Sequence, residues 1–74
     1  MKLNRNTKFQ VEAGDLLRFG NGDEYIVENI IGGSDRVGSR SALSFTICDT
    51  KDKRVIYGCP SSQLYGAEIV KGEN

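Results

Sequence analysis

The chain has 74 residues, a length that allows one domain with a small core and excludes a large enzyme. Hydrophobic residues make up 38% of it and charged residues 27%, a composition that argues against wholesale disorder. Ten Lys and Arg balance ten Asp and Glu, so no net charge draws the protein toward nucleic acid or an anionic membrane. Any electrostatic attraction to a partner therefore has to be local.

Residues 1–13 are expected to form a partly ordered N-terminal arm ahead of a single domain at 14–70, with a tail at 71–74. The first ten residues carry frequent charges where a signal peptide needs an apolar stretch. No apolar run approaches the ~20 residues that span a bilayer. These features predict a cytoplasmic protein with no membrane partner.

The first two strands are expected at 14–19 and 24–31, where β-favouring residues dominate. Between them lies Asn21-Gly22, the pair that type I′ hairpin turns prefer because both central residues need positive φ. The sequence therefore predicts a hairpin with its turn at these two residues.

The strand at 24–31 does not alternate cleanly between apolar and polar residues. Tyr25, Val27 and Ile31 fall on one face, whereas Ile26 and Ile30 fall on the other. A strand that bends across a barrel and contributes to both sides has this pattern.

A second hairpin is expected from residues 42–49 and 53–59, with its turn between Lys51 and Asp52. The first of these runs alternates apolar and smaller or polar side chains, as a half-buried strand does: Leu43, Phe45 and Ile47 against Ser44, Thr46 and Cys48. After Pro60, residues 61–64 are expected to form one helical turn, and residues 66–70 a closing strand.

The two cysteines are expected to be reduced. The hairpin register places Cys48 opposite Val55 and Cys59 opposite Ser44, so Cys59 lies about 13 Å from the position that a disulfide to Cys48 requires. The chain has no His and no third Cys, so a closed zinc site lacks ligands and a thiol nucleophile lacks its usual activator. We expect no metal, no cofactor and no catalytic residue.

The order of these elements resembles that of SH3-like small barrels. The segment "GCPSSQLYGAEIV" is similar to their end, where Gly, Pro and a helical turn precede the last strand, and "GDLLRFGNGDEYIVENI" is similar to the opening of bacterial SH3-like and KOW or Tudor-type barrels. The resemblance implies an all-β fold, a small five-stranded antiparallel barrel with one short helical turn before the last strand. Binding of proline-rich peptides is not implied, because the chain has no Trp and no Ala-Leu-Tyr-Asp-Tyr segment.

The segment "GGSDRVGSR" at 32–40 resembles a phosphate-binding loop in the spacing of Gly33 and Gly38. A phosphate-binding loop opens a helix, however, and the residues that follow here alternate as a strand. The two remaining interpretations are a plain surface connection and a recognition loop that displays Arg36 and Arg40.

A binding site can be assembled from this loop and its expected neighbours. Tyr65 follows the expected helical turn, which in SH3-like barrels adjoins the loop between the second and third strands, so Tyr65 could form a contact patch with Arg36 and Arg40. Tyr25 and Tyr57 are interpreted as core or barrel-rim residues. The second hairpin turn adds further cations to the candidate site: Lys51, Lys53 and Arg54.

Two function classes follow. Residues 36–54 hold five basic and two acidic residues, whereas residues 12–28 hold one basic and five acidic residues. Such a two-signed surface suits a protein partner and predicts a noncatalytic protein-binding module, an accessory or mobile-element protein, such as a phage encodes, that modulates a larger host complex. The alternative is a KOW-type barrel that binds nucleic acid through its local basic arc. The sequence does not indicate an oligomeric state.

Overall fold

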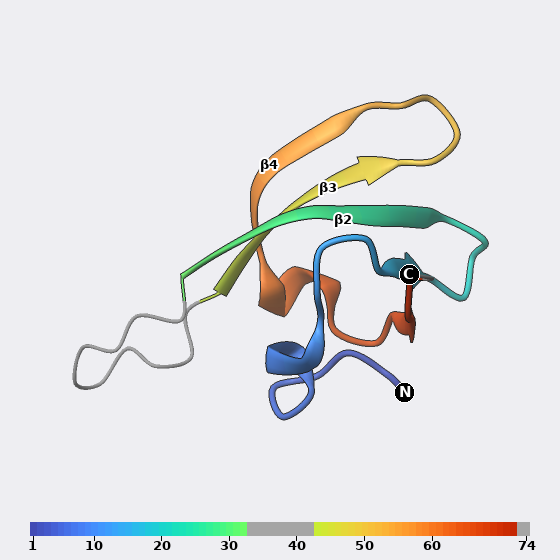
Figure 1. The fold of residues 1–74 in the computed structure, drawn as a ribbon. Coiled ribbons are helices and arrows are strands. Elements are labelled where there is room, and N and C mark those ends of the chain that lie inside the picture. The colour runs from blue at the N-terminus through green and yellow to red at the C-terminus, as the bar shows by residue number, and fades with distance from the viewer. Residues whose placement is uncertain (33–42, 73–74) are drawn as a thin grey trace.

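The computed structural model describes residues 1–32 and 43–72, and its strands form a single antiparallel sheet (Figure 1). The strands are β1 (Leu16–Arg18), β2 (Glu24–Gly32), β3 (Leu43–Asp49), β4 (Val55–Pro60) and β5 (Glu68–Val70). They pair in the order β4-β3-β2-β1-β5, and the helical elements among the described residues are two 3-10 turns, η1 (Lys8–Gln10) and η2 (Ser61–Leu64). The predicted all-β class, the five antiparallel strands and the helical turn before the last strand are confirmed.

The turn of the first hairpin differs from the prediction. The Phe19 N–H donates to the Asp23 carbonyl at 2.8 Å, and the Gly22 N–H donates to the Phe19 carbonyl at 3.0 Å, so the loop has three residues, Gly20 to Gly22. Gly22 has a φ of 97°, whereas Asn21 is not among the positive-φ residues. A single left-handed position after an ordinary turn closes this loop, so the type I′ assignment was wrong although the hairpin is present.

A β-bulge in β2 explains its irregular pattern. Val27 pairs with Ile47 and Asn29 pairs with Thr46, which leaves Glu28 as an extra residue. The extra residue inverts the alternation, so Ile30 packs against the core while Ile31 turns outward and is 55% exposed. The prediction that Ile31 shares a face with Tyr25 and Val27 was therefore wrong, although the strand does contribute to both sides.

A second irregularity shifts the register of β4. Cys48 pairs with Val55 as predicted, but Cys59 pairs with Phe45 instead of Ser44. Two residues of β4, Tyr57 and Gly58, stand opposite one residue of β3, and Gly58 takes a φ of 62° that few other residues tolerate. The insertion carries Cys59 inward, where it joins the core.

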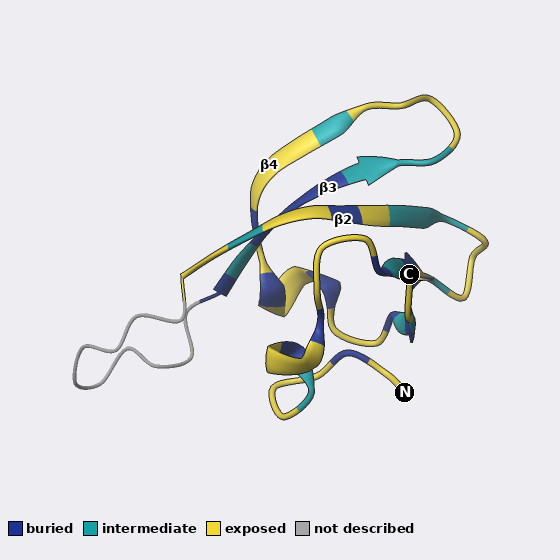
Figure 2. Cartoon of the chain, viewed as in Figure 1, coloured by how far each residue is buried: buried dark blue, intermediate teal, exposed yellow. Residues whose placement is uncertain are grey.

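The core lies on one face of the sheet and is closed by residues outside the strands. Phe45 and Leu17 at its centre are fully buried, as is Leu3 of the N-terminal segment. Figure 2 shows buried residues along β3 and exposed ones along most of β4. The remaining buried apolar residues surround this centre: Val11, Val27, Leu43, Ile47, Cys59, Leu64, Ala67 and Ile69.

Residues 1–11, which the sequence analysis placed in an arm outside the domain, supply Leu3 and Val11 to this core. The Leu3 N–H donates to the Ala67 carbonyl and the Ile69 N–H to the Met1 carbonyl, both at 2.8 Å. Lys2 also forms an isolated bridge with Glu68. The beginning of the chain therefore covers the free edge of β5.

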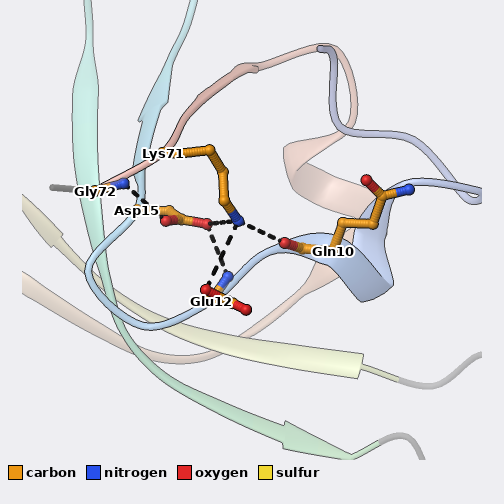
Figure 3. A network of polar contacts seen from close by, with 5 residues as sticks. All are labelled: Gln10, Glu12, Asp15, Lys71 and Gly72. Carbon is orange, nitrogen blue, oxygen red and sulfur yellow. Dashed lines mark hydrogen bonds and ion pairs between the residues drawn. The ribbon is translucent and has the colours of Figure 1, made fainter. Parts of the chain in front are cut away.

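A buried carboxylate joins the C-terminal segment to the loop before β1 (Figure 3). Asp15 accepts hydrogen bonds from Lys71 Nζ at 2.8 Å, from the Glu12 N–H at 2.8 Å and from the Gly72 N–H at 3.0 Å. Lys71 Nζ also donates to the Gln10 carbonyl at 2.7 Å. Burial raises the pKa of Asp15, but the hydrogen bonds from Lys71, Gly72 and Glu12 outweigh it and leave the pKa below its ordinary value.

Replacing Leu3 with Ala should destabilise the protein by about 2–4 kcal/mol, because it removes a fully buried side chain and leaves a cavity. The exposed Ile31 provides the control, since Ile31→Ala should change the free energy of unfolding by less than about 0.5 kcal/mol. Urea unfolding followed by circular dichroism measures both. Equal small effects would mean that residues 1–3 do not belong to the folded unit.

Replacing Asp15 with Asn should cost about 2–3 kcal/mol at pH 7, because the amide cannot accept all three donors and Lys71 loses its buried counterion. Glu12→Gln is the matched control, since Glu12 Oε1 lies 4.0 Å from the same ammonium on an exposed side chain. Its effect should stay below about 0.5 kcal/mol.

Because of the same carboxylate, the free energy of unfolding should depend on pH. Because the pKa of Asp15 is lowered by folding, its stabilisation is complete above the ordinary Asp value and is lost as the pH falls through the lower value of the folded state, in the range below about pH 4. Unfolding at pH 7 and pH 3 should therefore show a smaller loss of stability for Asp15→Asn than for the parent. Identical losses would contradict this assignment.

Candidate functional site

The three predicted basic residues of the β3–β4 turn are all exposed. Asp49 Oδ1 accepts a hydrogen bond from the Lys51 N–H at 2.8 Å, and Asp52 Oδ1 accepts one from the Arg54 N–H at 2.9 Å. Lys53 has a φ of 63°, a left-handed conformation that completes the turn. The two Asp side chains therefore fix the backbone that displays the cations.

The same carboxylates offset much of the positive charge of this turn. Lys51 Nζ lies 4.0 Å from Asp23 Oδ1 of the first hairpin, and Arg54 Nε lies 3.9 Å from Asp52 Oδ2. The surface at this end of the sheet consequently alternates in sign, and the basic arc that the sequence suggested is interrupted by acidic groups.

Tyr65 lies at the opposite end of the β3–β4 hairpin. It lines a hollow of about 360 Å³ together with Lys8, Leu43, Ser44, Pro60, Ser61 and Ser62. Leu43 begins β3 and Asp49 ends it, so the hollow and the basic turn are separated by about 20 Å of strand. Tyr65 and the cations of the turn therefore do not form one site.

Arg36 and Arg40 lie outside the described residues, so their expected patch with Tyr65 stays a prediction. Leu43, which lines the hollow beside Tyr65, is the first described residue after them.

A second hollow, of about 270 Å³, lies between the first hairpin and β4 and was missed by the sequence analysis. Phe19 and Tyr25 contact each other edge to face in its wall, with ring centroids 5.8 Å apart and planes at 86°. The sequence did hold a signal, because aromatic residues on both sides of a hairpin turn become diagonal neighbours once the strands pair. The other residues lining this hollow are Asn21, Asp23, Ile47, Ile56, Cys59, Gln63 and Leu64.

Carboxylates lie near the Tyr25 hydroxyl in this hollow. Partial burial raises the pKa of the Tyr25 hydroxyl, and the negative charges of Asp23, Asp49 and Asp52 raise it further. Asp23 is held in place by Asn21, whose Nδ2 donates to Asp23 Oδ2 at 3.1 Å and whose Oδ1 accepts from the Asp23 N–H at 3.0 Å. The hollow thus combines aromatic walls with a fixed carboxylate at its rim.

The outer face of the sheet, opposite the core, carries a continuous apolar row. Cross-strand pairing aligns one residue from each strand, in the order Val70, Leu16, Ile26, Cys48 and Val55. Ile26 in the middle of this outer row is 41% exposed. The other four residues of the row are partly exposed, so apolar side chains reach the surface on every strand of this face.

Tyr57 extends the apolar character of the outer face. Its side chain is 80% exposed, so its interpretation as a core or rim residue was wrong. The cause is strand alternation, because Tyr57 directly follows Ile56, which shares the core side of the sheet with its partner Ile47.

The cysteines occupy different environments and are both free thiols. Cys59 is buried, and this burial raises the pKa of its thiol. Cys48 is partly exposed on the outer row between Ile26 and Val55.

In residues 1–32 and 43–72, no three His, Cys, Asp or Glu residues gather where they could hold a metal ion. No helix in the described part of the chain is long and apolar enough to cross a membrane. Among known proteins, no family model, no curated sequence and no solved structure matches the chain.

Because their environments differ, the two cysteines should react with a thiol reagent at different rates. Titration of the unfolded, nonreduced protein with a thiol reagent should find two free thiols, whereas in the native protein Cys48 should react at least tenfold faster than Cys59, which is both buried and harder to deprotonate. The control is Cys48→Ser, in which only the slow phase should remain. Finding no free thiol, or equal native rates, would contradict the assignment.

Proposed function

We propose that this chain is a small noncatalytic protein-binding module that works in the cytoplasm as an accessory protein, such as a mobile element encodes, and modulates a larger complex. The observation that carries the proposal is the apolar outer row, centred on the exposed Ile26, on the face to which Ile31 and Tyr57 also point. Burying such a surface against a protein releases ordered water and supplies the favourable free energy of association.

The fold supports the same interpretation. The strand order, the bulged long β2 and the 3-10 turn before β5 are the features expected of an SH3-like barrel, and we propose this class for the domain. Folds of this kind serve many functions, so the surface, and not the fold, supports a protein partner.

Nucleic-acid binding is the second candidate, because Lys51, Lys53 and Arg54 are exposed together on one turn. Phosphate recognition requires cations that are free to replace counterions. Here Lys51 and Arg54 lie near Asp23 and Asp52, and the chain has no net charge. The balance of these observations favours a protein partner.

A pull-down from cytoplasm, with and without nuclease, distinguishes the two functions. The parent protein and two variants serve as baits: an outer-face variant, Ile26→Thr/Ile31→Thr, and a turn variant, Lys53→Ser/Arg54→Ser. We expect nuclease-resistant recovery of a protein partner by the parent and the turn variant, and a loss of at least tenfold with the outer-face variant.

Circular dichroism should show both variants folded, because all four substituted residues are exposed. Recovery that disappears with nuclease and with the turn variant would replace the proposed function with nucleic-acid binding. If all three baits recover the partner equally, the outer row is not the binding surface and no longer supports the proposed function.

A further inference from the structure

The two edges of the sheet differ in what covers them. The edge of β5 is paired with residues 1–3 through backbone hydrogen bonds and the bridge between Lys2 and Glu68. β4 pairs with β3 on one side, and no described strand pairs with its other side. An edge strand of this kind presents backbone donors and acceptors to any extended chain.

The hydrogen-bond pattern identifies which groups of β4 face outward. The Asp49 N–H donates to the Arg54 carbonyl at 2.8 Å, so these two residues are a hydrogen-bonded pair. Hydrogen-bonded and non-hydrogen-bonded pairs alternate along an antiparallel ladder. Ile56 therefore directs its N–H and C=O to β3, whereas Val55 directs both groups, and Tyr57 its N–H, to the open edge.

This open stretch is short and bounded. Lys53 and Arg54 precede it, and the bulge that begins at Tyr57 ends it, so the open stretch consists of Val55, Ile56 and the N–H of Tyr57. Charges and bulges beside an edge oppose its indiscriminate extension. Between these charges and this bulge, β4 has room to pair with one short extended segment of another chain.

The hollow between Phe19 and Tyr25 lies beside this stretch, on the face to which Ile56 points. Ile56 and Cys59 of β4 form one wall, and Phe19, Asp23 and Tyr25 of the first hairpin form the other. In a strand added to β4, the residue opposite Ile56 places its side chain on the same face as Ile56, at the mouth of this hollow.

The charges around the hollow define the side chain that fits it. Asp23, Asp49 and Asp52 act together on the Tyr25 hydroxyl, and the aromatic faces of Phe19 and Tyr25 also attract cations. Lys51 reaches Asp23 only at 4.0 Å on a largely exposed side chain, so this ion pair is weak and displaceable. A side chain with a long apolar stem and a cationic end can pack against the aromatic walls and pair with the carboxylate at the rim.

We propose that the open edge of β4 binds an extended segment of a partner protein by strand addition, and that a Lys or Arg of this segment enters the hollow between Phe19, Tyr25 and Ile56. This proposal rests on the proposed protein-binding function and gives it a ligand class. Backbone pairing with Val55 and Tyr57 supplies affinity, and the cationic side chain supplies selectivity.

The test uses a phage-displayed library of random ten-residue peptides selected on the immobilised protein. We expect enrichment of peptides with a Lys or Arg flanked by β-favouring residues. For the synthesised peptide, replacing that residue with norleucine should weaken binding at least tenfold, and Asp23→Asn in the protein should weaken the parent peptide but not the norleucine peptide.

The edge is tested with a matched pair of variants. Tyr57→Pro removes the N–H that faces the open edge and spares the ladder to β3, whereas Tyr57→Thr removes the ring and keeps the N–H. Binding should fall at least tenfold with the first and less than threefold with the second. In the parent protein, the peptide should slow hydrogen exchange of the Val55 and Tyr57 amides, a readout that does not depend on either variant folding.

No enrichment, enrichment without basic residues, or unchanged exchange at Val55 and Tyr57 would overturn the proposal. So would a dimer of the free protein, detected by sedimentation, that protects the same amides, because the edge would then be occupied by a second copy. A partner from the pull-down that binds Tyr57→Pro as tightly as the parent would remove the edge site and leave the protein-binding function standing.

Discussion

The arrangement of the whole surface depends on two single-residue insertions in the sheet. Glu28 in β2 and the extra residue at Tyr57-Gly58 in β4 each invert the alternation of side chains beyond them. Without the first, Ile30 would leave the core and Ile31 would enter it. Without the second, Cys59 would turn outward. The insertions also increase strand twist, which lets the five strands curve around Phe45.

A sheet of this size cannot enclose its core without help from the chain outside it. Leu3 and Val11 fill the side that the strands leave open, and the ring of donors around Asp15 holds the C-terminal segment beside the loop that precedes β1. The polar network stabilises chain ends, whereas the apolar residues stabilise the centre. This division leaves the outer face and the edge of β4 without a structural role in closing the fold.

The strands, both hairpins and the helical turn could be predicted because local periodicity and turn residues determine them. The alternation at Leu43, Phe45 and Ile47 correctly identified core positions. The insertions could not be predicted in the same way. A bulge changes the local free energy little, and its position depends on side-chain packing between strands. The roles of Leu3 and Asp15 depend on partners more than 50 positions away, as the 56 positions between Asp15 and Lys71 illustrate.

The candidate site was less predictable than the fold. Lys51, Lys53 and Arg54 were correctly expected at an exposed turn, but their interleaving with Asp23 arises from a contact between two hairpins. Tyr65 lies with Leu43 at the other end of the sheet, which no local pattern indicates. The hollow beside Tyr25 depends on strand pairing as well, so its walls become neighbours only after the sheet forms.

The pairing of residues 1–3 with the region of β5 also determines when the core can close. Leu3 is paired with Ala67, and Gln10 accepts a hydrogen bond from Lys71 across 61 positions. Both contacts join residues more than 60 positions apart, so each of them closes a long loop of chain. The core therefore closes only when these non-local contacts form, which makes folding depend on the slow meeting of distant segments.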